Sequence, residues 1–283
     1  MTEHAAQVEN GVRFEFGANW VRFLSVLNDE RIEEAKASLI RMLGVESLAG
    51  QTFLDVGSGS GLFSLAARML GAKVHSFDYD PQSFVCTAEL KRCYFAEDPD
   101  WTVEQGSILD KEYLSQLGQY DVVYSWGVLH HTGKMWEALA NVAPLVKTSG
   151  GHLYIAIYNK QRFLSTYWTL VKKTYNHVGV VFRWLMQIGY FLFFSMELLV
   201  ADVLRGRNPI LRYKGTGRRG MSMYYDVVDW IGGWPFEAAT PEEIFRFFTR
   251  NEFVLTELVT CGGNHGCNEF VFRRNNTSKI PLS

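Results

Sequence analysis

A glycine loop is the clearest candidate for chemistry in this sequence. The segment Leu54-Asp-Val-Gly-Ser-Gly-Ser-Gly61 follows a predicted strand and opens a predicted helix. Glycines let the backbone approach a ligand closely, and the start of a helix presents free N–H groups. Dinucleotide enzymes and plain tight turns also use such glycines, so the loop alone indicates a ligand-binding turn without naming its ligand.

Three further features narrow the kind of ligand. Asp55 stands just before the first glycine, and Asp78 ends the next predicted strand, 21 residues after Gly57. A carboxylate at that place can accept hydrogen bonds from both hydroxyls of a ribose. Gly106-Ser-Ile108 ends the third predicted strand, where such folds place the edge of an adenine. Together these features predict a site for an adenosine-containing cofactor.

A nicotinamide enzyme uses a similar glycine loop and acid, but its fingerprint is G-x-G-x-x-G. Here Gly57, Gly59 and Gly61 are each two residues apart, and position 62 is Leu. A predicted antiparallel hairpin at the end of the fold also argues against a dehydrogenase.

Two adjacent histidines are the candidate catalytic groups. The segment Ser125-Trp-Gly-Val-Leu-His-His131 follows the fourth predicted strand, at the edge where open α/β sheets bind ligands. Imidazole titrates near neutral pH, so His130 or His131 could remove a proton from an acceptor. The alternative role for each is to brace the loop through hydrogen bonds to the backbone.

The elements that must position these residues alternate between strand and helix. Periodicity predicts five strands at Thr52–Val56, Lys73–Asp78, Trp101–Gln105, Tyr120–Ser125 and Gly151–Tyr158. Helices are predicted at Glu30–Leu43, Leu62–Leu70, Pro81–Tyr94 and Lys134–Val146. A last helix, Pro241–Asn251, precedes a hairpin of Phe253–Thr260 and Asn268–Arg273.

This alternation predicts an α/β fold, a Rossmann-like doubly wound sheet of seven strands whose last hairpin is antiparallel. A large helical insert follows strand five. The predicted divisions are an N-terminal helical cover (1–50), a Rossmann-like core (51–158), the basic and aromatic insert (159–239), the closing helix and hairpin (240–274) and a polar tail (275–283).

The stretch from Asn28 to Tyr158 resembles the class I methyltransferases that depend on S-adenosyl-L-methionine (SAM), and is similar to the ubiquinone-biosynthesis O-methyltransferases. The similarity includes Asn28-Asp-Glu-Arg31 and Tyr120-Asp-Val-Val-Tyr-Ser-Trp126. It implies that Arg31 pairs with the SAM carboxylate, Gly57 touches the methionine moiety, Asp78 holds the ribose and Trp126 lines the adenosine pocket. The full predicted cofactor set is Arg31, Asp55, Gly57, Ser58, Gly59, Gly61, Asp78, Tyr79, Ser107, Ile108, Ser125 and Trp126.

Each of the key assignments has a structural alternative. Arg31 could be a solvated residue at a helix start, Asp78 a turn residue and Trp126 a core aromatic. Relatives that bind magnesium resemble an E-x-x-E-H pattern in the loop after strand four, where this chain has Gly127, His130 and His131. Hard divalent cations want oxygen ligands, so no metal is expected.

The insert is expected to set specificity. From Asn159 to Tyr225 the chain has eleven basic residues and two acidic ones, Glu197 and Asp202, whereas the whole protein has a net charge of −2. Within it Val178–Leu204 is mostly apolar, but the run between Arg183 and Glu197 is 13 residues, too short to span a bilayer. Three hypotheses stay open: a lid or homodimer element, an interfacial helix on anionic lipid, and a nucleic-acid surface, which the clustering of aromatics with aliphatics disfavours.

The predicted activity is transfer of a methyl group to a small or amphipathic acceptor, most simply O-methylation of an aromatic, quinone-like or glycosylated molecule. The candidate acceptor residues are Tyr224, Asp226, Trp230, Trp234, His265, Asn268 and Glu269. The alternatives are a SAM-consuming cyclase or lyase, and a SAM-binding protein without turnover.

The composition suggests the compartment. The four cysteines form no CxxC pair, and the polar start Met1-Thr-Glu-His has no basic region followed by an apolar run. We therefore expect a cytoplasmic protein with reduced thiols, with membrane association left open.

Overall fold

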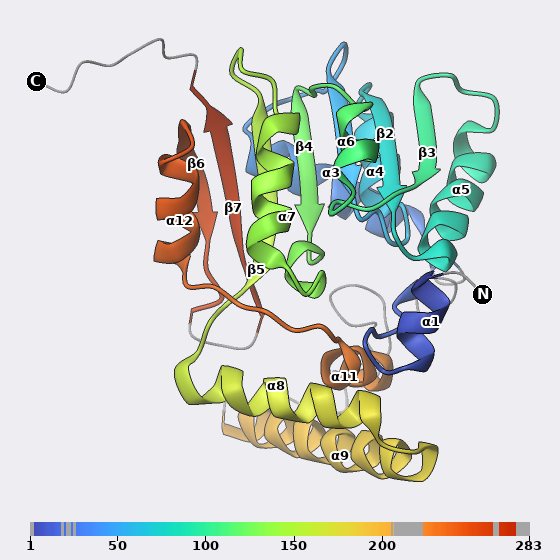
Figure 1. Cartoon of the computed structure of the whole chain (residues 1–283), viewed down its shortest axis with the longest axis vertical. Coiled ribbons are helices and arrows are strands. Elements are labelled where there is room, and N and C mark those ends of the chain that lie inside the picture. Colours follow the sequence, from blue (N-terminus) through green and yellow to red (C-terminus); the bar gives the residue numbers. More distant parts are fainter. Residues whose placement is uncertain are drawn as a thin grey trace, which may run out of the picture.

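One mixed sheet organises the chain, as Figure 1 shows. The computed structural model describes residues 3–17, 20, 24, 27–204, 206, 223–262 and 266–275, with the backbone alone at 201, 223–226 and 229. In this part of the chain seven strands pair in the order β3-β2-β1-β4-β5-β7-β6. They are β1 Thr52–Val56, β2 Lys73–Asp78, β3 Trp101–Gln105, β4 Val122–Trp126, β5 His152–Tyr158, β6 Phe253–Val259 and β7 Cys267–Arg274.

The pairing directions confirm the predicted fold class. Strands β1 to β5 run parallel, and β7 is antiparallel to both β5 and β6. The carboxyl ends of the parallel strands therefore meet at one edge of the sheet. Strand β1 lies between β2 and β4, so the strand order reverses at β1. Open α/β sheets place their ligands at such a point.

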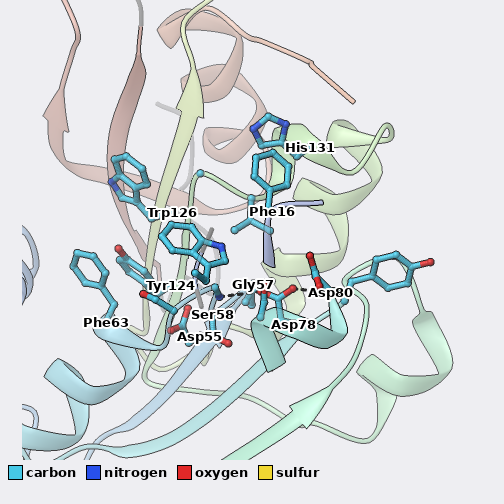
Figure 2. Close-up of a pocket in the computed structure, with 18 of the residues that line it drawn as sticks. Phe16, Asp55, Gly57, Ser58, Phe63, Asp78, Asp80, Tyr124, Trp126 and His131 are labelled. Atoms are coloured by element: carbon cyan, nitrogen blue, oxygen red, sulfur yellow. Dashed lines mark hydrogen bonds between the residues drawn. The ribbon is translucent and has the colours of Figure 1, made fainter. Parts of the chain in front are cut away.

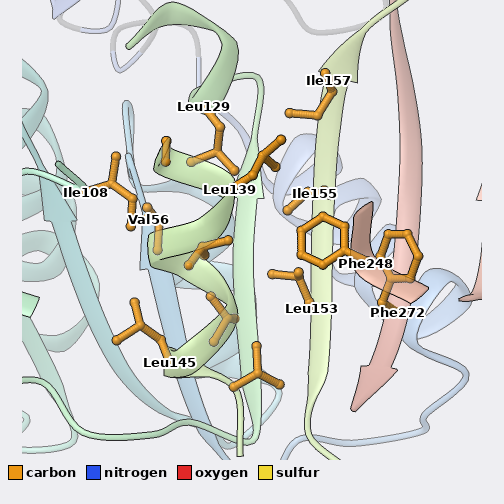
Figure 3. Packing of buried hydrophobic residues seen from close by; sticks show 14 of the residues in the cluster. Val56, Ile108, Leu129, Leu139, Leu145, Leu153, Ile155, Ile157, Phe248 and Phe272 are labelled. Atoms are coloured by element: carbon orange, nitrogen blue, oxygen red, sulfur yellow. The ribbon is translucent and has the colours of Figure 1, made fainter. Parts of the chain in front are cut away.

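Helices cover both faces of the sheet. On one face lie α3 (Asp29–Leu43), α4 (Leu62–Met69) and α5 (Pro81–Phe95), and on the other α6 (Lys111–Ser115), α7 (Met135–Val142) and α12 (Pro241–Thr249). Figure 3 shows the second core, in which strand residues such as Val56 and Ile155 pack against Leu139 and Phe248. Because both faces are covered, the central strands β1, β4 and β5 are buried along almost their whole length, without an alternating exposed side.

Several helix starts follow from local side-chain chemistry. Asn28 caps α3 by accepting a hydrogen bond from the Arg31 N–H, and Asp80 caps α5 in the same way, with Pro81 in the first turn. Thr240 and Glu243 form a reciprocal capping box at α12. These caps place Arg31 and the Asp78–Asp80 turn next to the sheet edge.

Most boundaries lie within one or two residues of prediction, and two of the differences have a clear structural reason. The helix predicted to reach Val146 ends at Val142 and continues as a 3-10 turn, Ala143–Leu145, because Pro144 cannot donate a helical hydrogen bond. Tyr120 makes only an isolated bridge to Val146, so β4 starts two residues later than expected.

A third layer lies below the carboxyl edge of the sheet. It contains α1 (Glu3–Glu9), α8 (Arg162–His177), α9 (Val180–Leu204) and α11 (Met223–Gly232), and Figure 1 shows α8 and α9 side by side at this end of the molecule. Trp168, Val171 and Tyr175 of α8 pack against Val227 and Ile231 of α11 in a separate core. This layer closes the ligand edge of the sheet.

Candidate active site

A cavity of about 640 Å³ lies at the carboxyl ends of β1, β2 and β4. Its walls come from the glycine loop, α3, the segment before α3, the loop after β4 and α11. Figure 2 shows the glycine loop below Phe16 and His131. The position agrees with that expected from the strand order. The sequence-predicted residues that line it are Arg31, Asp55, Gly57, Ser58, Gly59, Asp78, Tyr79, Ser107, Ile108, Trp126, His131, Trp230 and Glu269.

The glycine loop adopts positive φ angles, which are strained for residues other than glycine. Gly57 and Gly59 have φ angles of 79° and 56°, and a Cβ on Gly57 would lie 2.4 Å from a methyl group of Val128. The Gly57 N–H donates to the Phe77 carbonyl at 2.8 Å, which ties the loop to β2. The tight turn thus forms a backbone cradle at the cavity floor.

Asp78 connects this loop to the next one. Its carboxylate accepts hydrogen bonds from the backbone N–H of Gly59 and of Asp80, each at 2.9 Å. Burial raises the pKa of Asp78 to about 6, although both hydrogen bonds lower it. With a pKa near 6 the group is mostly ionised at pH 7, and a carboxylate is the stronger acceptor for ribose hydroxyls.

Asp55 lies under the cavity at the end of a buried polar chain. The Trp101 indole donates to Ser76 at 2.9 Å, Ser76 and Ser64 lie 2.7 Å apart, and the Ser64 hydroxyl donates to Asp55 at 2.5 Å. Burial raises the pKa of Asp55 to about 7. These hydrogen bonds run across the neighbouring strands β3, β2 and β1 and fix the orientation of the Asp55 carboxyl group.

Arg31 and Trp126 lie on the far wall of the same cavity. Arg31 is 8% exposed, and its place in the first turn of α3 follows from the Asn28 cap, whose side chain accepts from the Arg31 N–H at 3.1 Å. Figure 2 shows Trp126 above Tyr124 and Phe63, two rings that stack at 4.9 Å. A guanidinium suits a carboxylate, and an indole face suits a purine, so both positions agree with the roles that the resemblance implies.

His131 faces the cavity in a defined protonation state. Its Nδ1 lies 2.6 Å from the Pro235 carbonyl oxygen, which can only accept, so Nδ1 carries the proton and Nε2 is the basic nitrogen. Burial lowers the pKa of His131 to about 3, with the nearby Lys172 charge as the next cause. The ring packs 4.8 Å from Phe16, as Figure 2 shows. At neutral pH the histidine thus offers an uncharged acceptor nitrogen.

His130 occupies a different environment. It is fully buried and does not line the cavity; the Tyr158 N–H donates to its Nδ1 at 3.4 Å, and the Glu237 N–H donates to its carbonyl at 3.0 Å. Burial lowers the pKa of His130 well below its usual value. These contacts favour the bracing role that the sequence left open for it.

Lys172 lies buried behind the cavity wall, whereas the sequence placed it among the basic residues that flank the apolar run of the insert. It is completely buried, and its ammonium lies over the rings of Trp230 at 4.4 Å and Phe236 at 4.9 Å while donating to the Trp230 carbonyl. Its charge lowers the pKa of both histidines. A signal was present, because Lys172 falls on the same helical stripe as Trp168 and Tyr175, but the charge run around it hid that pattern.

The N-terminal segment contributes a wall that was foreseen only as a helical cover. Arg13, Phe14, Phe16 and Trp20 line the cavity. The Arg13 guanidinium donates to the His131 carbonyl at 3.1 Å, and Trp20 lies against Gly59. The only sequence signal was an unusual density of aromatics between positions 14 and 20.

Other predicted site residues lie elsewhere in the fold. Gly61 does not line the cavity; it allows close packing of α4 on Thr87, where a Cβ would meet the backbone at 3.0 Å. Ser125 is buried and donates to the Val56 carbonyl. Asn268 connects Cys261 to Asn159 and holds the hairpin, while Trp234 accepts a backbone hydrogen bond from Phe14.

The remaining acceptor candidates are placed only in part. Glu269 lines the cavity and accepts a hydrogen bond from the Tyr154 hydroxyl. His265 lies outside the described residues, as do the side chains of Tyr224 and Asp226. Within the described part of the chain, no group of three or more His, Cys, Asp or Glu side chains is arranged to hold a metal ion.

Comparison with known proteins identifies the domain. Residues 54–153 match a family model described as a methyltransferase domain. A ubiquinone biosynthesis O-methyltransferase from Xanthomonas oryzae pv. oryzae is 31% identical over 137 residues, which cover 48% of this chain and 52% of that protein. The chain thus spans about half the length of the curated relatives it matches.

Solved structures share the fold at low sequence identity. The magnesium protoporphyrin IX methyltransferase of Synechocystis PCC 6803, with bound SAH, gives a TM-score of 0.50 at 16% identity, covering 87% of this chain and 83% of that one. A 1,6-didemethyltoxoflavin-N1-methyltransferase of Burkholderia thailandensis, with bound 1,6-didemethyltoxoflavin and S-adenosylhomocysteine, gives 0.51 at 14% identity, with coverages of 97% and 91%.

The fold, the domain match and the site together define the class. Residues 54–153 match a methyltransferase domain, and the lining of the cavity fits SAM as the cofactor of such a domain. The residues present fit this cofactor, since the glycine cradle, the ionised Asp78 and the Arg31 guanidinium line one cavity. The predicted class, enzyme type and cofactor are confirmed.

Proposed function

We propose that this protein transfers the methyl group of SAM to a hydroxyl oxygen of a small aromatic, quinone-like or glycosylated acceptor. The observation that carries the proposal is the neutral His131, whose Nε2 is the basic nitrogen on the wall of the cavity that also contains the glycine loop. An O–H acceptor must lose a proton during transfer, and Nε2 can accept it or orient it.

Three groups divide the work of holding the cofactor. Arg31 would pair with its carboxylate, the loop around Gly57 would contact the methionine part, and Asp78 would accept from the ribose hydroxyls. When bound, SAM supplies an electrophilic methyl group on a positively charged sulfur. The protein then has mainly to hold the acceptor oxygen in line, and such positioning alone can account for much of the rate.

Electrostatics favour an acceptor with an acidic hydroxyl. A histidine with a pKa near 3 is a weak base, so it cannot readily deprotonate an ordinary alcohol. The Lys172 and Arg13 charges that lower this pKa also favour an oxygen anion in the same cavity. A phenol or quinol, whose hydroxyl is more acidic than that of an alcohol, therefore suits this site better than an alcohol does.

The cavity walls support a flat acceptor. Phe14, Phe16, Tyr158 and Trp230 line the part of the cavity near His131, and the Tyr158 and Trp230 rings meet edge to face at 5.4 Å. Aromatic walls bury aromatic ligands well and add geometric selectivity. A small phenolic or quinol ring fits this lining better than an aliphatic amine does.

A product assay tests the proposal. Purified protein is incubated with SAM and separate panels of phenols, quinols, glycosides and amines, and the products are identified by mass spectrometry. S-adenosylhomocysteine formed with hydroxyl acceptors is the expected result. Formation with amines alone would contradict O-methylation, methylthioadenosine would indicate a SAM-consuming cyclase, and SAM binding without any product would indicate a non-catalytic binder.

A pair of histidine variants sharpens this assay. His131→Gln removes the basic nitrogen from the cavity, whereas His177→Gln changes an exposed histidine at the end of α8. We expect only His131→Gln to lose turnover while keeping SAM affinity. Equal turnover of the two variants would remove His131 from the reaction.

A further inference from the structure

The sidedness of α9 is reversed relative to a helix on a water-exposed surface. Such helices turn polar side chains to solvent and apolar ones to the core. Apart from Glu197, the exposed large side chains of α9 are apolar: Val180, Val181, Phe182, Trp184, Leu185, Leu192, Phe193, Met196, Leu199, Val200, Val203 and Leu204. An 18-residue window of this helix has a mean hydropathy at the level of membrane spans (1.5), and none of it is buried within the described structure.

Three polar side chains of α9 point instead toward the protein, whereas Glu197 is exposed. The Arg183 guanidinium donates to the Tyr175 carbonyl at 3.0 Å and to the Asn176 carbonyl at 2.7 Å, both at the end of α8. The Gln187 amide donates to the Tyr175 hydroxyl at 2.7 Å. Asp202, near the other end, is 1% exposed. Burying these groups while exposing a dozen apolar ones is unfavourable in water.

Helix α8 extends the same apolar surface. Phe163 is 89% exposed, and Leu164, Tyr167 and Leu170 are also exposed along one side of the helix. The Tyr167 hydroxyl is hydrogen-bonded to that of Tyr190 in α9 at 2.6 Å, so the two exposed faces adjoin. We call this joint surface, formed by the exposed apolar residues of α8 and α9, the apolar platform.

We propose that the apolar platform docks on the surface of an anionic lipid bilayer. The platform faces away from the sheet, with α9 as its outermost element (Figure 1), so it is not the surface that closes the cavity. Arg162 and Lys173 are exposed on α8, and the sequence from 205 to 219 adds six basic residues and no acidic one. Apolar faces with basic flanks suit the boundary between headgroups and acyl chains.

The contacts of α9 favour a helix that lies in the membrane plane. Its 25 residues could span a bilayer by length, but Arg183, Gln187 and Phe194 contact α8 along its course. A spanning orientation would carry α8, with the exposed Lys173, into the hydrocarbon region, where a charge is costly. Partial insertion of the platform satisfies the apolar face without that cost.

Vesicle sedimentation tests the proposal with the full chain. Phosphatidylcholine vesicles with and without phosphatidylglycerol are mixed with the protein at low and high salt. We expect sedimentation with the anionic vesicles that weakens as salt screens the charges. The variant Leu185→Glu/Phe193→Glu should bind these vesicles at least about tenfold more weakly than the parent. Its matched control is Val85→Glu, an equally exposed apolar residue on α5, which should bind like the parent.

Circular dichroism and thermal melting establish that the variants are folded, and size-exclusion chromatography reports association. Failure of the folded parent to sediment with anionic vesicles at low salt overturns the proposal. So does unchanged sedimentation of the double variant. The parent could instead be a dimer that does not bind vesicles. If Leu185→Glu/Phe193→Glu converts that dimer to a monomer, the platform binds a second copy of the chain. Because no outcome depends on turnover, failure here leaves the proposed methyl transfer intact.

Discussion

At the scale of single residues, the ionisation of Asp78 controls cofactor binding. Asp78→Ala should weaken SAM binding by about 1.5–3 kcal/mol, because two ribose hydroxyls lose a charged acceptor. Since the pKa of Asp78 is raised to about 6, affinity of the parent should fall as pH drops through 6, and the variant should not show this fall. Calorimetry across pH measures both effects. Unchanged affinity in Asp78→Ala would remove the residue from the site.

Mutating the two histidines one at a time should give different effects. His131→Ala should lower kcat by about 10²–10⁴-fold with little effect on SAM affinity, because the residue lines the cavity and its Nε2 is the basic nitrogen. His130→Ala should instead lower the melting temperature, since its ring is buried against Tyr158 at 4.0 Å. Kinetics normalised to the folded fraction distinguish the two. The opposite pattern would exchange the roles.

Lys172 should act on His131 through its charge. Lys172→Met keeps the length of the side chain and removes the ammonium, so the pKa of His131 should rise from about 3 toward 6.5, remaining below it because burial persists. Nitrogen-detected NMR titration measures this pKa directly. Lys173→Met, at the adjacent exposed position, is the control and should leave the pKa unchanged. An unaltered pKa in Lys172→Met would show that burial alone sets it.

At the scale of elements, the turn between β1 and α4 shapes the cofactor site. Gly57→Ala puts a Cβ 2.4 Å from Val128 at a φ of 79°, so the turn must shift. We expect lower stability and at least about tenfold weaker SAM binding, as the backbone cradle opens. Gly118→Ala has a similar φ of 76° with open space around it, and so should cost stability alone. Equal SAM affinity in both variants would contradict the cradle.

The strands and helices of the core could be predicted from the sequence because their residue patterns each fit one kind of element. Strands β1, β2 and β3 have the predicted bounds, since apolar runs bordered by glycine, proline or aspartate have few alternatives. The insert was predicted to be helical, but no bounds were predicted for α8, which has apolar residues on its outer side (Phe163 and Leu170) as well as on its inner side (Trp168 and Val171).

The part of the candidate site that sequence motifs mark was predicted. The glycine loop, Asp78 and His131 converge on one cavity as expected, because strand ends in a parallel sheet meet at one edge. The contributions of Arg13, Phe16 and Lys172 depend on how distant segments fold over that edge. Local patterns carry no information on such packing, so the acceptor side could not be drawn from the sequence.

At the scale of the whole molecule, buried carboxyl groups should make the ligand-free protein less stable as pH rises. The pKa of Asp55 is about 7 when folded against 3.8 when unfolded, so the folded state holds an extra proton between these values. That stability is present below pH 3.8 and is lost as pH rises through 7. Asp55→Asn should therefore gain melting temperature relative to the parent between pH 5 and pH 8.

The histidines titrate with the opposite sign. The pKa of His131 is lowered to about 3, so its contribution is present above pH 6.5 and is lost as pH falls through 3. Comparing Asp55→Asn with the parent at each pH cancels this effect. A melting-temperature difference that stays constant from pH 5 to pH 8 would mean that Asp55 is ionised throughout.

Helix α8 has two distinct sides, with Lys172 against Trp230 and Phe236 on one and Phe163 in the apolar platform on the other. A ligand on either side that prefers one position of the helix biases that position for the other. Thermodynamic reciprocity then requires that lipid and acceptor change each other's affinity by one common factor. The acceptor dissociation constant with and without vesicles, and the vesicle affinity with and without acceptor, form a closed cycle whose two ratios must agree. A ratio of one would mean that α8 keeps its two sides energetically separate.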